Sequence, residues 1–73
     1  MKITLESTTK IVEVDGVPSR IWEGETASGV RVHAYVTRIA VAIQDYTVEF
    51  DDELQACRTP SPEVAAIPLR LML

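Results

Sequence analysis

Five residues in the central part of the chain hold most of its capacity for binding chemistry. They comprise the only tryptophan, the only histidine, one of two tyrosines and two arginines: Arg20, Trp22, Arg31, His33 and Tyr35. An aromatic platform beside guanidinium groups could stack on a base and bind a phosphate. Tryptophan, tyrosine and arginine also dominate the hot spots of protein–protein interfaces. In a purely structural interpretation, Trp22 and Tyr35 form a cross-strand aromatic pair beneath a helix, and the arginines are solvated.

The other reactive residue types lack the partners that catalysis or metal binding needs. His33 has neither an orienting carboxylate at a fixed spacing nor an accompanying nucleophile. Cys57 follows Leu54 at helical spacing, which favours a small core residue over a reactive thiol. A single histidine and a single cysteine cannot form a zinc site unless carboxylates or a second chain contribute, and the acids at 49–53 lack the glycine turn of a calcium loop. We therefore expect no enzymatic activity, no cofactor and no metal.

Length and composition predict one small folded domain over residues 1–73. The chain has 47% apolar residues, a net charge of −4 and one cysteine. The negative charge disfavours general nucleic-acid binding, and no apolar run is long enough to span a membrane. A lone cysteine and a start without a signal-peptide pattern predict a cytoplasmic protein. Because so small a core is marginal and one cysteine excludes an internal disulfide, we expect a homo-oligomer.

Two β-turns must position the five candidate residues. Asp15-Gly16 lies between β-branched runs and predicts a two-residue type I′ hairpin. The pairs in that register are Val14 with Val17, Glu13 with Pro18, Val12 with Ser19 and Lys10 with Ile21. The polar residues Ser7 to Thr9 could be a bend or a continuation of the first strand.

The second turn lies within 25–29, and its length sets the strand pairing. A two-residue Ser28-Gly29 loop places Trp22 opposite Tyr35, whereas a four-residue loop places it opposite His33. These registers differ by an even slip, so both put Trp22 on the face of Tyr35 and His33. We therefore expect the five candidate residues to share the face away from the core. The opposite, apolar set of that strand is Val30, Val32, Ala34 and Val36.

Beyond Arg38 the apolar residues change sides of the predicted strand. A β-bulge near 37–38 would explain this change, as would burial on both faces, by a helix and by a second subunit. A helix over 38–49 is disfavoured by the density of β-branched residues. Small alanines at 40 and 42 suit close packing. The predicted oligomer interface consists of Ile39, Val41, Ile43, Leu69 and Leu71.

The C-terminal third predicts helical cover and a last strand. A helix over about 47–58 would have Asp51 near its start and Arg58 in its last turn, although 44–50 also alternates like a strand. Ser61 before Pro62 predicts one capped helical turn at 62–66, and the tail should pair as a strand within its own sheet or across a dimer. The predicted fold is α+β, a small antiparallel β-meander of three to five strands with one short helix packed on one face.

The opening KITLESTTKIV, the segment DGVPSRIWEGETASGV and the ending AAIPLRLML resemble short uncharacterised proteins of bacteriophages and prophages. The resemblance spans most of the chain and assigns no residue a role. It implies a small, acidic, cytoplasmic phage protein, and such proteins often block a host factor or sequester a small molecule. We expect a non-enzymatic protein that binds and inhibits a host bacterial protein, for instance a component of a defence system. A sponge for a nucleotide-like anion is the second hypothesis, and a structural subunit of an assembly is the third.

Overall fold

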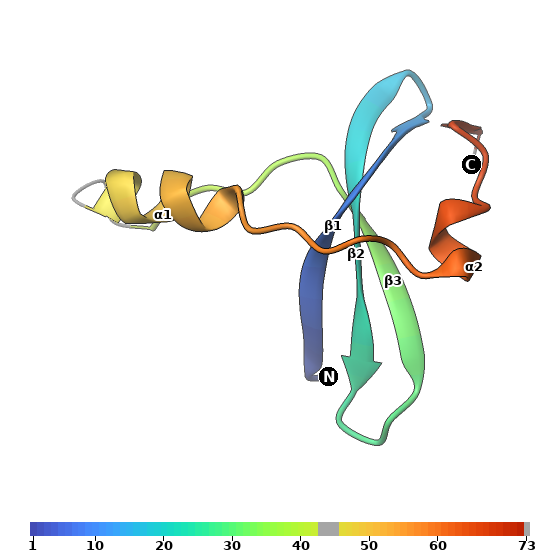
Figure 1. The fold of residues 1–73 in the computed structure, drawn as a ribbon, viewed down its shortest axis with the longest axis horizontal. Coiled ribbons are helices and arrows are strands. Elements are labelled where there is room, and N and C mark those ends of the chain that lie inside the picture. Colours follow the sequence, from blue (N-terminus) through green and yellow to red (C-terminus); the bar gives the residue numbers. More distant parts are fainter. Residues whose placement is uncertain (43–45, 73) are drawn as a thin grey trace.

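A four-stranded sheet forms the centre of the computed structural model, which describes residues 1–42 and 46–72 (Figure 1). The strands lie in the order β3-β2-β1-β4. The elements are β1 (Ile3–Val14), β2 (Val17–Thr26), β3 (Arg31–Val36), α1 (Thr47–Leu54), α2 (Pro62–Ala65) and β4 (Arg70–Leu71). The first three strands are an antiparallel meander, whereas β4 runs parallel to β1. The α+β class is confirmed, but the sheet is mixed, because the chain crosses over through α2 before β4 joins β1.

The first hairpin follows the predicted type I′ turn. Asp15 and Gly16 have φ angles of 49° and 87°, and the pairing from the turn back to Val12–Ser19 is as expected. The predicted pairing of Lys10 with Ile21 is wrong, because the register shifts between Ser7 and Ile11. The cause lies at Thr8, whose buried hydroxyl donates a 2.7 Å hydrogen bond to the carbonyl of Ile21. Residues 8–10 therefore bulge within a strand that continues on both sides.

The second hairpin has a loop of three residues, whereas the sequence predicted a loop of either two or four. The Thr26 amide donates to the Val30 carbonyl at 2.9 Å, and the Gly29 amide donates to the Thr26 carbonyl at 3.0 Å. Gly29 takes the positive φ of 89° that closes such a loop. Trp22 is consequently paired with Ala34. Compared with either predicted register the slip is odd, so every side chain of β3 lies on the opposite face.

The core lies on one side of the sheet, beneath α2. Val12 of β1 and Ile21 of β2 pack with Val64 of α2, and all three are almost fully buried. Tyr35 and Leu71 are among the half-buried residues around them. We call this side the covered face.

The opposite side of the sheet is apolar. Within residues 1–42 and 46–72, no helix or strand packs over it closely enough to bury its apolar side chains. Paired residues of neighbouring strands share a face. From the register, the apolar side chains of this open face are Ile3, Leu5, Ile11, Trp22, Val32, Ala34 and Val36. None of them is fully buried. The apolar set of β3 therefore faces away from the core, contrary to the expected arrangement.

The two helices exchange the roles that the sequence predicts. α1 ends at Leu54, short of residue 58, and begins after Tyr46 without a side-chain cap, so Asp51 is an interior residue. No residue of α1 is buried, and Figure 1 shows it extending to one side of the sheet. The helix that packs on the sheet is α2. It is capped by Ser61 as predicted, with the Val64 amide donating to the Ser61 hydroxyl.

The segment after β3 explains the change of apolar parity more simply than a bulge or a second subunit. β3 ends at Val36, so the chain has already left the sheet at Arg38. Ile39 is 41% exposed, Val41 is half-buried, and Ile43 lies outside the described residues. Of the tail residues predicted at an oligomer interface, Leu69 is exposed while Leu71 packs against the core of its own chain.

The tail strand belongs to its own sheet, one of the two arrangements expected. The Glu13 amide donates to the Leu69 carbonyl at 2.7 Å, and the Asp15 amide donates to the Leu71 carbonyl at 2.8 Å. Within residues 1–42 and 46–72, neither helix has the length and apolar character that crossing a membrane requires.

Candidate functional site

The five candidate binding residues are divided between the two faces of the sheet. Arg20 and Trp22 lie on the open face, whereas Arg31, His33 and Tyr35 lie on the covered face. The expected single aromatic-basic surface is therefore wrong, and so is the Trp22–Tyr35 pair. The cause is the three-residue loop, because one residue more or less between two strands inverts one strand relative to the other. Two separate surfaces have to be considered.

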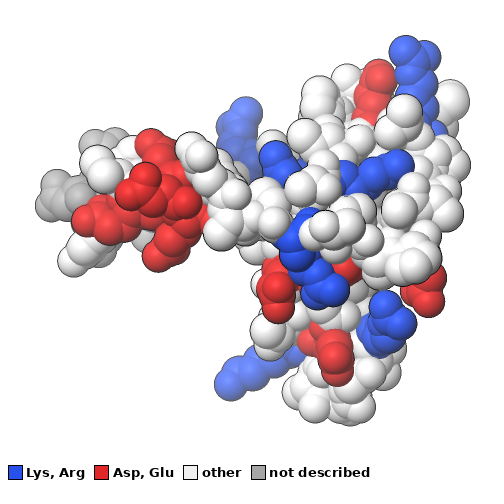
Figure 2. Space-filling view, in the orientation of Figure 1, with Lys and Arg blue, Asp and Glu red and all other residues white. Residues whose placement is uncertain are grey.

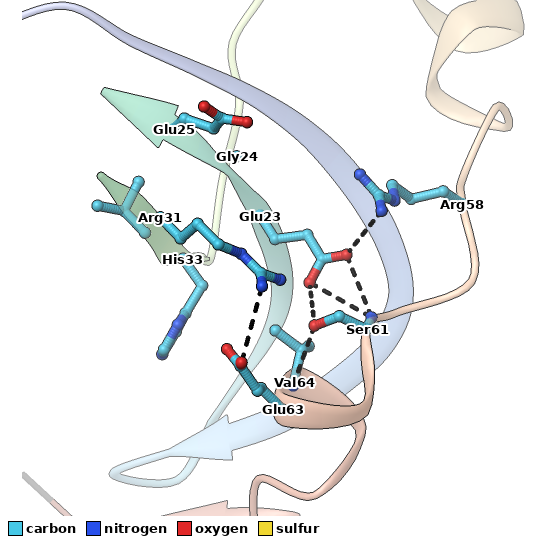
Figure 3. A pocket seen from close by; sticks show the side chains of 10 residues that line it. Glu23, Gly24, Glu25, Arg31, His33, Arg58, Ser61, Glu63 and Val64 are labelled. Carbon is cyan, nitrogen blue, oxygen red and sulfur yellow. Dashed lines mark hydrogen bonds and ion pairs between the residues drawn. The ribbon is translucent and has the colours of Figure 1, made fainter. Parts of the chain in front are cut away.

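A polar pocket of about 290 Å³ lies on the covered face, between β2, β3 and the segment that enters α2 (Figure 3). Its floor holds Glu23, whose side chain is only 9% exposed. The Glu23 carboxylate accepts a hydrogen bond from the Ser61 hydroxyl at 2.8 Å and from the Ser61 amide at 3.2 Å. The guanidinium of Arg58 lies 3.3 Å from the same carboxylate. These contacts connect β2 to the segment 58–61.

The arginines of this pocket are opposed by carboxylates. Arg58 pairs with Glu23, and Arg31 lies 3.7 Å from Glu63 (Figure 3). Glu25 also lines the pocket, so its glutamates outnumber its arginines. A bound phosphate would have to compete with these carboxylates for each guanidinium. The pocket therefore offers weak support for an anion sponge.

His33 and Tyr35 interact with each other at the side of this pocket. The Tyr35 hydroxyl and His33 Nε2 are 3.2 Å apart, and the two rings meet edge to face with centroids 5.5 Å apart. In the part of the chain that the structure describes, no three His, Cys, Asp or Glu residues are grouped to hold a metal ion. The pair fits a local contact along β3.

The contact network around Glu23 was not predicted from the sequence. A glutamate between Trp22 and Gly24 in an alternating strand gives no sign that it is buried. The one signal was the predicted cap at Ser61, because a cap fixes where that backbone amide points. Its partner across the fold, at a separation of 38 residues, could not be found by spacing. The network holds the connection to α2 on the sheet.

The open face has a different chemistry. A mainly apolar pocket of about 260 Å³ is lined there by Ile11, Trp22 and Val36 from the sheet, and by Phe50 and Leu54 from α1. Ile3 and Ile11 are 43% and 49% exposed, although both are large aliphatic residues. Trp22 is half-buried. Contiguous exposed apolar surface on a small protein is typical of an interaction site.

Arg20 lies on the open face but its charged group is used within the chain. Its Nη1 donates to the Thr8 carbonyl at 2.7 Å and to the sulfur of Cys57 at 3.3 Å. Cys57 is half-buried and also lies 3.6 Å from the Ser7 hydroxyl. The guanidinium of Arg20 therefore stabilises the bulge of β1 and the segment after α1, and Arg38 is the other charged residue that lines the apolar pocket.

Acidic residues border the open face on the side of α1. α1 contains Glu49, Asp51, Asp52 and Glu53, and its last turn has no basic residue. Figure 2 shows this cluster as the red region on the projecting part of the molecule, separate from the basic groups over the sheet. A partner on the open face would meet apolar side chains at its centre and carboxylates at this border.

The comparisons with known proteins add no relative: no protein-family model, curated protein or solved structure matches the chain.

Proposed function

We propose that this chain is a non-enzymatic binding protein whose open face binds another protein. The observation that supports it is the apolar surface of Ile3, Ile11, Trp22 and Val36, on the side of the sheet away from α2. Removing such a surface from water yields about 25 cal/mol per Å², which is the main driving force of protein association. The partner is then a protein with a complementary apolar patch.

Trp22 is the expected hot spot of this interface. It lies on the central antiparallel pair of the sheet, with Ser7 on one side and Ala34 on the other. Both neighbours are small, so the indole is the largest side chain in its row. Tryptophans in this situation contribute disproportionately to binding, while the surrounding contacts exclude water. Phe50 and Leu54 extend the same surface onto α1.

A protein partner fits the open face better than a small ligand does. The apolar pocket is shallow and is continuous with exposed aliphatic side chains on β1. Small-molecule sites are concave and place a few polar groups to orient the ligand. Two arginines line this pocket: the guanidinium of Arg20 is already bound to Thr8 and Cys57, and Arg38 is exposed to solvent. The open face is thus a broad, shallow surface that suits a protein partner better than an enclosed small ligand.

The proposed partner is a host bacterial protein, and binding would inhibit it. This part of the proposal follows from the resemblance of the chain to short phage and prophage proteins, and it places the chain in the cytoplasm of the host. The acidic border on α1 predicts that the partner's surface is basic beside its apolar patch, since unlike charges steer association.

Capture from a bacterial lysate on immobilised protein tests the proposal. We expect the wild-type chain to retain one bacterial protein in stoichiometric amount, and Ile11→Asp to retain none, because a charge on the open face would have to be desolvated on binding. Met72→Asp is the matched control, because Met72 is 92% exposed and lies in the tail. Equal capture by Ile11→Asp and the wild type would refute the assignment to this face, as would the absence of any captured protein.

A further inference from the structure

The outer edge of β3 is a second surface of the molecule, distinct from the open face. β3 is the last strand on its side of the sheet formed by residues 1–42 and 46–72. An outermost strand presents backbone amides and carbonyls that a further strand can pair with. Such an edge is usually blunted by proline, a charge directed inward or a short length. β3 is six residues long, and its sequence RVHAYV contains no proline.

The loop hydrogen bonds determine which backbone groups point outward. Val30 accepts from the Thr26 amide, and its own amide donates to the Thr26 side chain, so Val30 directs both groups toward β2. Backbone direction alternates along an antiparallel pair. Val32, Ala34 and Val36 therefore also bond to β2, whereas Arg31, His33 and Tyr35 direct their amides and carbonyls to the outer edge.

We propose that this edge pairs with the same edge of a second copy, antiparallel and about a two-fold axis at His33. Only the register centred there uses all three outward residues, pairing Arg31 with the other Tyr35 and His33 with its counterpart. Each of these pairs can exchange two backbone hydrogen bonds. A two-fold contact of this kind is self-complementary and closed, so it stops at a dimer.

The side chains of β3 are compatible with that register on both faces. On the covered face each Arg31 meets a tyrosine ring, a favourable cation–π geometry, and no arginine faces an arginine. On the open face Val32 meets Ala34 of the other copy, so the apolar surface continues across the junction. The dimer thus has one continuous sheet of eight strands. Because the two-fold axis is perpendicular to the sheet, the open faces of both copies lie on the same side of it. This inference does not depend on what the open face binds.

Sedimentation equilibrium from about 10 µM to about 1 mM tests the dimer, a range that covers weak association. The mass should rise from 8.1 kDa toward twice that value. His33→Pro should remain at 8.1 kDa, because it removes an outward amide while all β2–β3 hydrogen bonds are kept. His33→Ala retains the amide and should dimerise like the wild type. Circular dichroism must show both variants folded as the wild type.

A second measurement identifies the register directly and does not depend on any variant. In a mixture of labelled and unlabelled chains, an intermolecular NOE should join the α-protons of Val32 and Ala34, because that pair is not hydrogen-bonded and its Cα atoms are about 4.5 Å apart. A wild-type mass of 8.1 kDa throughout would overturn the proposal. Dimerisation of His33→Pro, loss of the dimer in His33→Ala, or intermolecular NOEs from other residues only would also overturn it.

Discussion

Glu23 shows how much of this small fold depends on one buried polar residue. Its carboxylate binds Arg58 and both the amide and the hydroxyl of Ser61, and it is the only glutamate that is buried among the described residues. A buried carboxylate is tolerated only when it is paired and hydrogen-bonded, as it is here. Because Ser61 also caps α2, the same contacts hold Val64 over the core.

Glu23→Gln should therefore lower the free energy of unfolding by about 1–3 kcal/mol, the usual cost of losing charge-assisted hydrogen bonds at a buried site. Chemical denaturation followed by tryptophan fluorescence measures it. The matched control is Glu25→Gln on the same strand and face, where the side chain is exposed and the change should stay within about 0.5 kcal/mol. Similar losses in the two variants would mean that the contacts of Glu23 contribute nothing specific.

Gly24 is required for a different reason, the close approach of β1 and β2. A Cβ atom at this position would overlap the backbone carbonyl of Thr4, which cannot move aside as a side chain can. We expect Gly24→Ala to lose at least about 3 kcal/mol in thermal or chemical unfolding. Gly29→Ala is the comparison: its nearest neighbour would be 3.9 Å away, so only the positive φ costs stability, about 1 kcal/mol. A larger loss at Gly29 would contradict this assignment.

At the level of elements, the two helices differ in what they contribute to stability. Val64 of α2 is 3% exposed, whereas Val48 of α1 is 70% exposed. Val64→Ala should therefore cost about 1.5–3 kcal/mol. Val48→Ala removes the same atoms from the surface of a helix and should change stability by less than about 0.5 kcal/mol. Equal losses of stability in the two variants would contradict the exposed position of Val48 on α1.

The sequence predicted the elements whose signals are local. The Asp15-Gly16 turn and the Ser61 cap were correct, because positive φ and capping each depend on a few neighbouring residues. The loop at 27–29 was not predicted, since its alanine, serine and glycine are compatible with turns of two, three or four residues. That single residue decided the face of β3, and with it the whole candidate site. The helix prediction at 47–58 overran because Arg58 bonds to β1 instead, in a bridge with Thr8.

For the whole molecule, the small core and the open face have one cause. A chain of 73 residues forms two layers only where α2 lies, so one side of its sheet has no second layer in the described structure. Alternation correctly grouped Val32, Ala34 and Val36 on one side of β3, but it put Trp22 on the other side and placed the apolar set of β3 against the core. We place the partner on the side left open, with the acids of α1 at its border.

Photo-crosslinking in bacterial cells tests whether the open face binds a bacterial protein. A benzophenone amino acid replaces Ile11 on the open face in one variant and Met72 in the tail in another, both at exposed positions. We expect the Ile11 variant to form one adduct with a bacterial protein, identified by mass spectrometry as a chain other than this one, and the Met72 variant to form none. Absence of that adduct at Ile11, or the same adduct in equal amount from Met72, would contradict it.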